Sequence, residues 1–311
     1  MQLTREGKKM VETTQIKVGT HRFTVDTDGP QTGETVLFLH GYPNSRHSWT
    51  ELLSGVAERG FRGVAPDQRG YSPGARPEAV ADYHVDRLVQ DVIGLADAIG
   101  APRFHLVGHD WGGQIAWLTA ARHPERLRSL TVLSRPHPAA FAAAMKSDPQ
   151  QAKRSGHHKA FQDANMAERL LADDARRVRR TLCFENALQP SAANPKQPAA
   201  KRRMSDEAAD QHLSVLGSPA AMNAALNWYR AAFSGNSTLA RADVPPVVVP
   251  TVYMWGNEDM SVGQTAATLT ADFVDAPYHL ESIDGAGHFL SEEVPQRVLR
   301  ALLGHLENNT A

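Results

Sequence analysis

The stretch GHDWGG, residues 108–113, decides the fold of this 311-residue chain. Its spacing matches the nucleophile elbow G-x-S-x-G, a tight turn between a buried strand and a helix, but Asp110 stands where the serine would be. Small residues are needed because the helix packs close to the strand, and the side chain at the tip is forced upward. The helix N-terminus beneath it favours a negative charge. The pattern therefore predicts an ionised, reactive Asp110; a helix-capping role alone would not require glycines on both sides.

Apolar runs and helical patterns alternate around this turn. Buried strands are predicted at 35–41, 61–67, 103–109, 127–134, 250–256 and 278–284. Helices are predicted at 84–100, 112–124 and 295–306. Strands that alternate with helices imply right-handed crossovers and a mostly parallel sheet, so we expect an α/β fold.

The alternation breaks between 137 and 246, where the sequence has helical spacing, no clear strand and a polar, proline-rich loop at 189–203. We therefore expect an α/β core formed by residues 1–136 and 247–311, with residues 137–246 inserted into it as a helical cap.

Composition excludes several classes of function. Lys and Arg number 33 against 34 Asp and Glu, which gives no electrostatic reason to expect nucleic acid or an anionic membrane as partner. The single cysteine, Cys183, excludes an internal disulfide and a thiolate zinc cluster. No apolar run fits a signal peptide or a membrane span. We expect a cytoplasmic monomer or homodimer without cofactor or metal.

A nucleophile needs a base and an acid that orients it, and in this fold they follow the nucleophile in the order acid, histidine. His288 lies in DGAGHF, in a glycine-rich loop after the strand at 278–284. Asp259 follows the preceding strand and is placed to hold the imidazole in the right tautomer, with Glu258 as the neighbouring alternative.

The segment HGYP, residues 40–43, follows the strand at 35–41. We expect the backbone N–H of Tyr42, together with that of Trp111, to form an oxyanion hole. The alternative is a plain Gly-Pro turn.

Six motifs carry a resemblance over nearly the whole chain: HGYPNSRHSW, PDQRGYSPG, GHDWGG, PHPAAF, NWYR and DGAGHFLSEEVP. They resemble the epoxide hydrolases of the α/β-hydrolase fold. The resemblance implies an eight-stranded, mostly parallel sheet, an Asp nucleophile, a His–Asp pair and a cap that supplies two tyrosines to protonate the epoxide oxygen. Tyr229 in NWYR matches one tyrosine, whereas His157 stands at the position of the other.

The resemblance implies that a hydrophobic epoxide becomes a vicinal diol through an alkyl ester on Asp110, which water activated by His288 and Asp259 then hydrolyses. We expect the residues beside these motifs to line the substrate pocket: His40, Phe161, Gln162, Trp228 and Phe289.

Haloalkane and haloacetate dehalogenases share the Asp nucleophile and are the alternative. The former usually have Asn or Glu at the position of Tyr42, and the latter use arginines where this chain has Trp111 and Gln114. A binding protein on a hydrolase scaffold is a third reading, which the complete set of Asp110, Asp259 and His288 disfavours.

Overall fold

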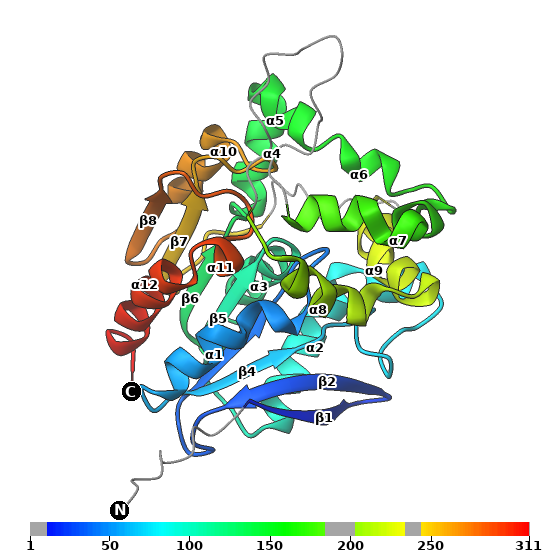
Figure 1. Ribbon diagram of the computed structural model, residues 1–311. Helices are drawn as coiled ribbons and strands as arrows, with labels where there is room; N and C mark the ends of the chain where they lie inside the picture. The colour runs from blue at the N-terminus through cyan, green and yellow to red at the C-terminus, as the bar shows by residue number, and fades with distance from the viewer. Residues whose placement is uncertain (1–10, 184–202, 234–243, 311) are drawn as a thin grey trace, which may run out of the picture.

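A computed structural model describes residues 11–183, 203–233 and 244–310 (Figure 1). At its centre lies an eight-stranded sheet in the order β1-β2-β4-β3-β5-β6-β7-β8. The strands are β1 (Glu12–Val18), β2 (His21–Asp28), β3 (Thr35–Leu39), β4 (Arg62–Pro66), β5 (Phe104–His109), β6 (Leu127–Leu133), β7 (Thr251–Gly256) and β8 (Tyr278–Ile283). Every pairing from β4 to β8 is parallel, and β2 pairs antiparallel with β1 and β4. The expected α/β fold with a mostly parallel sheet is confirmed.

The six predicted strands all form, and so do the three predicted helices. The sequence reasoning missed the antiparallel hairpin of β1 and β2 at the edge of the sheet. It also missed α1 (Thr50–Ala57).

Helices cover both faces of the sheet. On one face, α1 lies against β4 and α12 (Pro295–Glu307) lies against β6 and β7, and α12 buries residues four apart: Val298, Leu302 and Leu306. On the other face lie α2 (Val85–Ala98) and α3 (Trp111–Arg122). The predicted stripe of α2 is buried as expected, because Leu88, Val92 and Leu95 lie on one side of a 3.6-residue period.

A set of helices, here called the inserted helices, lies between β6 and β7. They are α4 (Pro138–Ser147), α5 (Pro149–Arg154), α6 (His157–Ala160), α7 (Met166–Cys183), α8 (Asp206–Leu216) and α9 (Pro219–Phe233). Figure 1 shows them, in green to yellow, above and beside the sheet. Their buried side chains join those of the sheet in one apolar cluster, so they are part of the packed structure. Of the polar loop predicted at 189–203, all but Arg203 lies outside the described residues.

The remaining helices are short. They are α10 (Gln264–Leu269), α11 (Leu290–Glu293) and the 3-10 turns η1 (Arg46–Trp49), η2 (Val80–Tyr83), η3 (Pro124–Arg126) and η4 (Thr270–Phe273). Among the described residues, no helix is long and apolar enough to cross a membrane.

Candidate active site

Asp110 lies at the tip of a strained turn between β5 and α3. Its φ of 50° and ψ of −115° are unfavourable for any residue except glycine, and such strain persists only where the surroundings enforce it. The close approach of α3 to the sheet is one such constraint, since a Cβ on Gly112 would lie 2.0 Å from the carbonyl oxygen of Leu39. The turn therefore lifts the Asp110 carboxylate above the carboxyl ends of the parallel strands, where ligands bind in this class of sheet.

The loop after β3 approaches the same carboxylate. The backbone N–H of Tyr42 donates a hydrogen bond of 2.9 Å to Asp110 Oδ1. Trp111 is the first residue of α3, so its N–H has no partner within the helix. One carboxylate oxygen is thus fixed, and Oδ2 is the oxygen that faces His288.

His288 joins Asp110 to Asp259. Its Nε2 lies 3.6 Å from Asp110 Oδ2, and its Nδ1 donates a 2.8 Å hydrogen bond to Asp259 Oδ2. The other oxygen of Asp259 accepts the N–H groups of Ser261 and Val262 at 2.6 and 3.0 Å, which fixes the carboxylate. The structure therefore pairs His288 with Asp259. The alternative acid, Glu258, is half exposed and pairs with an arginine instead.

The electrostatics of this group favour an ion pair at rest. Burial lowers the pKa of His288, but the carboxylates of Asp259 and Asp110 outweigh it and raise the pKa to about 10. Burial likewise opposes ionisation of Asp110, and the hydrogen bond and charge of His288 overcome it, so the pKa of Asp110 falls well below its ordinary value. At neutral pH, the pair is an ionised carboxylate beside an imidazolium.

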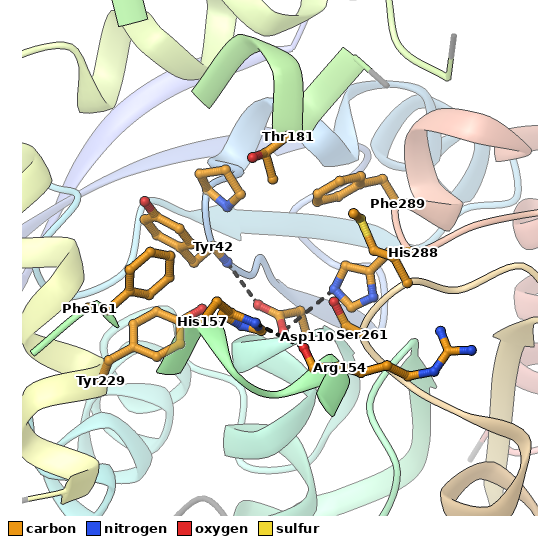
Figure 2. Close-up of a pocket in the computed structure, with 12 residues that line it drawn as sticks. Tyr42, Asp110, Arg154, His157, Phe161, Thr181, Tyr229, Ser261, His288 and Phe289 are labelled. Atoms are coloured by element: carbon orange, nitrogen blue, oxygen red, sulfur yellow. Dashed lines mark hydrogen bonds and ion pairs between the residues drawn. The ribbon is translucent and has the colours of Figure 1, made fainter. Parts of the chain in front are cut away.

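A cavity of about 210 Å³ opens above Asp110. Figure 2 shows the aromatic rings of Tyr42, Phe161 and Tyr229 on one side of it and His288 with Phe289 on the other. Phe161 and Phe289, two of the residues predicted for the substrate pocket, lie in the wall of this cavity. The wall is mostly apolar and the reactive groups are few, which is the usual composition of a small-molecule site.

Tyr229 reaches the cavity from α9 and is 3% exposed. Burial, followed by the nearby charge of Asp110, raises the pKa of its phenol well above the ordinary value. Its ring packs edge-on against Trp111 at 5.0 Å and against Phe161 at 4.8 Å. Tyr229 is therefore a rigid, protonated hydroxyl group that faces the nucleophile.

His157 also lines the cavity, with its ring centroid 6.2 Å from that of Tyr229. Burial lowers its pKa, so the ring is neutral at pH 7. Its Nδ1 lies 3.2 Å from the carbonyl oxygen of Arg154, which can only accept, so the single ring proton resides on Nδ1. Neutral His157 then presents a lone pair at Nε2 and has no proton to donate from that atom.

Three residues predicted for the pocket do not belong to this cavity in the described part of the chain. The His40 ring is fully buried beneath it, where Nε2 accepts the N–H of Gln68 and burial lowers the pKa to about 3. Trp228 is also fully buried, and its indole donates to the carbonyl of Arg69. Gln162 is exposed on the outside. Sequence proximity to a motif predicted these contacts, but two of the side chains are packed in the core, and the amide of Gln162 donates to the backbone carbonyls of His158 and Tyr229.

The sequence reasoning missed other residues of the cavity wall. They are Pro43, Arg154, Thr181, Met260 and Ser261. Met260 and Ser261 directly follow Asp259 and could have been found from that spacing. Arg154 and Thr181 come from the inserted helices, where no motif in the sequence marks them.

Metal binding finds no support in the described residues, where no cluster of three or more His, Cys, Asp or Glu side chains could hold an ion.

Comparison of the chain with known proteins assigns it to a family. The family model described as the alpha/beta hydrolase fold matches residues 34–295. The chain belongs to the α/β-hydrolase fold family.

Within that family, several of the similar proteins are named epoxide hydrolases. The chain is 32% identical to Epoxide hydrolase A of Mycobacterium tuberculosis, over 91% of this chain and 96% of that protein. It is 30% identical to Epoxide hydrolase 3 of Xenopus tropicalis, over 93% of this chain and 75% of that protein. The crystal structure of Epoxide Hydrolase A from Mycobacterium thermoresistibile superposes with a TM-score of 0.80 at 26% identity, covering 96% and 98% of the two chains. The resemblance to epoxide hydrolases seen in the sequence is confirmed.

Proposed function

We propose that this member of the α/β-hydrolase family is an epoxide hydrolase that converts a hydrophobic epoxide and water into a vicinal diol. The observation that carries the proposal is that Asp110, His288 and Tyr229 all face one cavity. A carboxylate nucleophile, a histidine and a protonated phenol are the three groups that ring opening through an ester requires.

In the first half of the reaction, Asp110 Oδ2 attacks a carbon of the epoxide and the carbon–oxygen bond of the ring breaks. The Tyr42 N–H holds Oδ1, which leaves Oδ2 as the attacking oxygen. The ring oxygen leaves as an alkoxide and takes a proton from Tyr229, whose raised pKa keeps that proton available. The product is an alkyl ester on Asp110, with one free hydroxyl on the substrate.

In the second half, His288 takes a proton from water, and the resulting hydroxide attacks Cγ of Asp110. Negative charge develops on Oδ1, where the Tyr42 N–H already donates and the Trp111 N–H is a second donor. The ester bond breaks, the diol oxygen takes the proton from His288, and Asp110 keeps one oxygen from water. The second proton of that water, left on the new Asp110 carboxyl group, passes to the Tyr229 phenolate, which restores the phenol and the ionised nucleophile. Asp259 accepts the Nδ1 proton of His288 throughout, so Nε2 is the ring atom that gains and loses a proton.

We further propose that residues 137–246 act as the cap. α9 supplies Tyr229, while α6 and α7 supply His157 and Thr181 to the same wall. Because Tyr229 is protonated and neutral His157 carries its proton on Nδ1, the proposed acid is Tyr229, with His157 as an acceptor that can orient a hydroxyl group.

A substrate screen with isotope labelling tests this function. Styrene-type epoxides, bromoalkanes and haloacetates are offered to the wild type and to Asp110→Ala, with Asp284→Ala as an exposed carboxylate control near His288. Diol formation by the wild type and the control but not by Asp110→Ala is expected. A single turnover in ¹⁸O water should give unlabelled diol and leave ¹⁸O in Asp110.

His288→Gln should let the ester accumulate, visible as a mass increase on the peptide that contains Asp110. Halide release without diol formation would favour the dehalogenase alternative. If the protein binds these compounds but converts none of them, the result would favour a non-catalytic binding protein.

A further inference from the structure

The backbone on both sides of His288 is held by one buried carboxylate. Glu293, on α11, accepts the N–H of Gly287 at Oε2, 2.8 Å away, and the N–H of Phe289 at Oε1, 3.0 Å away. The carbonyl of His288 in turn accepts a 2.9 Å hydrogen bond from His109 Nε2. These bonds determine where the imidazole points, because they fix the peptide groups immediately before and after it.

Glu293 is itself paired with Arg203, which leads into the inserted helix α8. Arg203 Nη1 lies 3.1 Å from Glu293 Oε2 and donates to the carbonyl of Gly285 at 2.5 Å. Its Nη2 pairs with Glu258, the residue before Asp259. The side chains of Arg203 and Glu293 are 6% and 3% exposed. One guanidinium therefore joins the Asp259 loop, the His288 loop and α11.

The same arginine is anchored among the inserted helices. Its backbone N–H donates a 2.8 Å hydrogen bond to the carbonyl of Cys183, at the end of α7. Nearby, His212 on α8 contacts Glu292, the neighbour of Glu293, at 3.0 Å. The first contact anchors Arg203 to α7, and the second joins α8 to the segment that carries His288.

We propose that Arg203 is a positioning residue, which couples the inserted helices to the alignment of His288 through Glu293. A buried carboxylate that loses its cationic partner is driven toward water, and a displaced Glu293 can no longer accept both loop N–H groups. The His288 loop would then shift. The nucleophile would be spared, because Asp110 is held by β5, α3 and the Tyr42 N–H instead.

This inference rests on the proposed two-step function and predicts that the two steps respond differently. Ester formation needs Asp110 and Tyr229, whereas ester hydrolysis needs His288 aligned to within a fraction of an ångström. A displacement of about 1 Å costs on the order of 100-fold. Arg203→Met should therefore slow hydrolysis by about 10- to 100-fold and change ester formation by less than about 3-fold.

The test is a single-turnover, rapid-quench experiment with intact-mass detection of the ester, run with the best epoxide of the screen. Arg179→Met is the matched control, because this arginine of α7 pairs with Asp210 at 2.6 Å and with Asp174, both of which belong to the inserted helices. The control should behave as the wild type. Arg203→Lys keeps the positive charge but not the planar guanidinium with its several N–H donors, so it should recover part of the hydrolysis rate. Equal slowing of both steps, or no slowing of hydrolysis, would overturn the proposal.

Two further measurements test the role of Arg203 where the first experiment gives no result. If Arg203→Met does not fold, Glu293→Gln replaces it, since the amide can accept only one of the two N–H groups. Unchanged hydrolysis in that variant overturns the coupling. If the wild type forms no ester, the proposed function fails, and the downfield proton resonance of His288 Nδ1–H decides instead. A change in that signal in Arg203→Met, but not in Arg179→Met, supports the positioning role, and an unchanged signal refutes it.

Discussion

The charge of Asp259 and, with it, that of Asp110 raise the pKa of His288, and Asp110→Asn tests the part that Asp110 contributes. The substitution replaces the carboxylate by a neutral amide of the same shape, as esterification would. At an effective dielectric constant of about 20, a unit charge 3.6 Å from Nε2 contributes about 4.6 kcal/mol, or about 3 pKa units. The pKa of His288, about 10 in the wild type, should therefore fall to about 7.

The assay is an NMR titration of protein labelled with ¹⁵N in the histidine rings. The signal of His288 is assigned by its loss in His288→Gln, and His109 serves as an internal reference, because burial lowers its pKa to about 4. Asp284→Asn removes a carboxylate from the same loop and should leave the pKa of His288 unchanged. A pKa that stays near 10 in Asp110→Asn would mean that Asp259 alone sets it, and would refute the reasoning.

The remaining predictions concern the acid, the turn and stability. Tyr229→Phe should slow epoxide opening by about 10²–10⁴-fold, while bromide release from an alkyl bromide changes little; equal losses would favour the halide reading. His157→Phe should cost far less in diol formation than Tyr229→Phe, since neutral His157 directs its proton to a carbonyl of α5; a comparable loss would identify it as the acid. Gly112→Ala should lower the free energy of unfolding in urea by about 1–3 kcal/mol or more, because its Cβ would meet a carbonyl oxygen of β3; wild-type stability would contradict this. The raised pKa of His288 stabilises the fold fully below pH 6.5, and this contribution is lost as pH rises toward 10. The stability difference between wild type and His288→Gln should thus shrink by about 1.4 kcal/mol per pH unit between pH 7 and 10, and a constant difference would argue against the ion pair.

Much of the sheet could be predicted because buried parallel strands are continuous apolar runs. β5 and β7 are buried at every position, so the runs stood out from their surroundings. The hairpin of β1 and β2 was missed because β1 lies at the edge and is mostly exposed. The alternation in β2, with Phe23 and Val25 buried, and the glycine turn at Gly19 were signals that could have revealed it.

The site was predictable where its residues follow strands, and not where they come from the inserted helices. Asp110, Asp259 and His288 each follow a strand of the parallel sheet, whose carboxyl ends meet at one edge, so chain order alone brings them together. His40 and Trp228 lie in equally distinctive motifs, yet both are buried packing residues. The direction of a side chain next to a motif depends on tertiary packing that the sequence pattern does not contain.

Arg203 and Glu293 carried no such signal, since a single charged residue in a polar segment is usually solvated. Their burial becomes evident only when the inserted helices are folded over the sheet.

The two halves of the proposed reaction make opposite demands on His288, and the charge of Asp110 can reconcile them. While Asp110 is ionised, the imidazole is protonated and cannot remove a proton from water. In the proposed reaction, esterification removes the carboxylate charge and is expected to bring the pKa of His288 from about 10 toward about 7, the range in which a general base is effective at neutral pH. Asp259 remains charged, so it still fixes the tautomer. Formation of the ester on Asp110 thus makes His288 an active base, and His288 then promotes hydrolysis of that ester. The short distance between Asp110 and His288 is sufficient to make ester formation precede activation of the base.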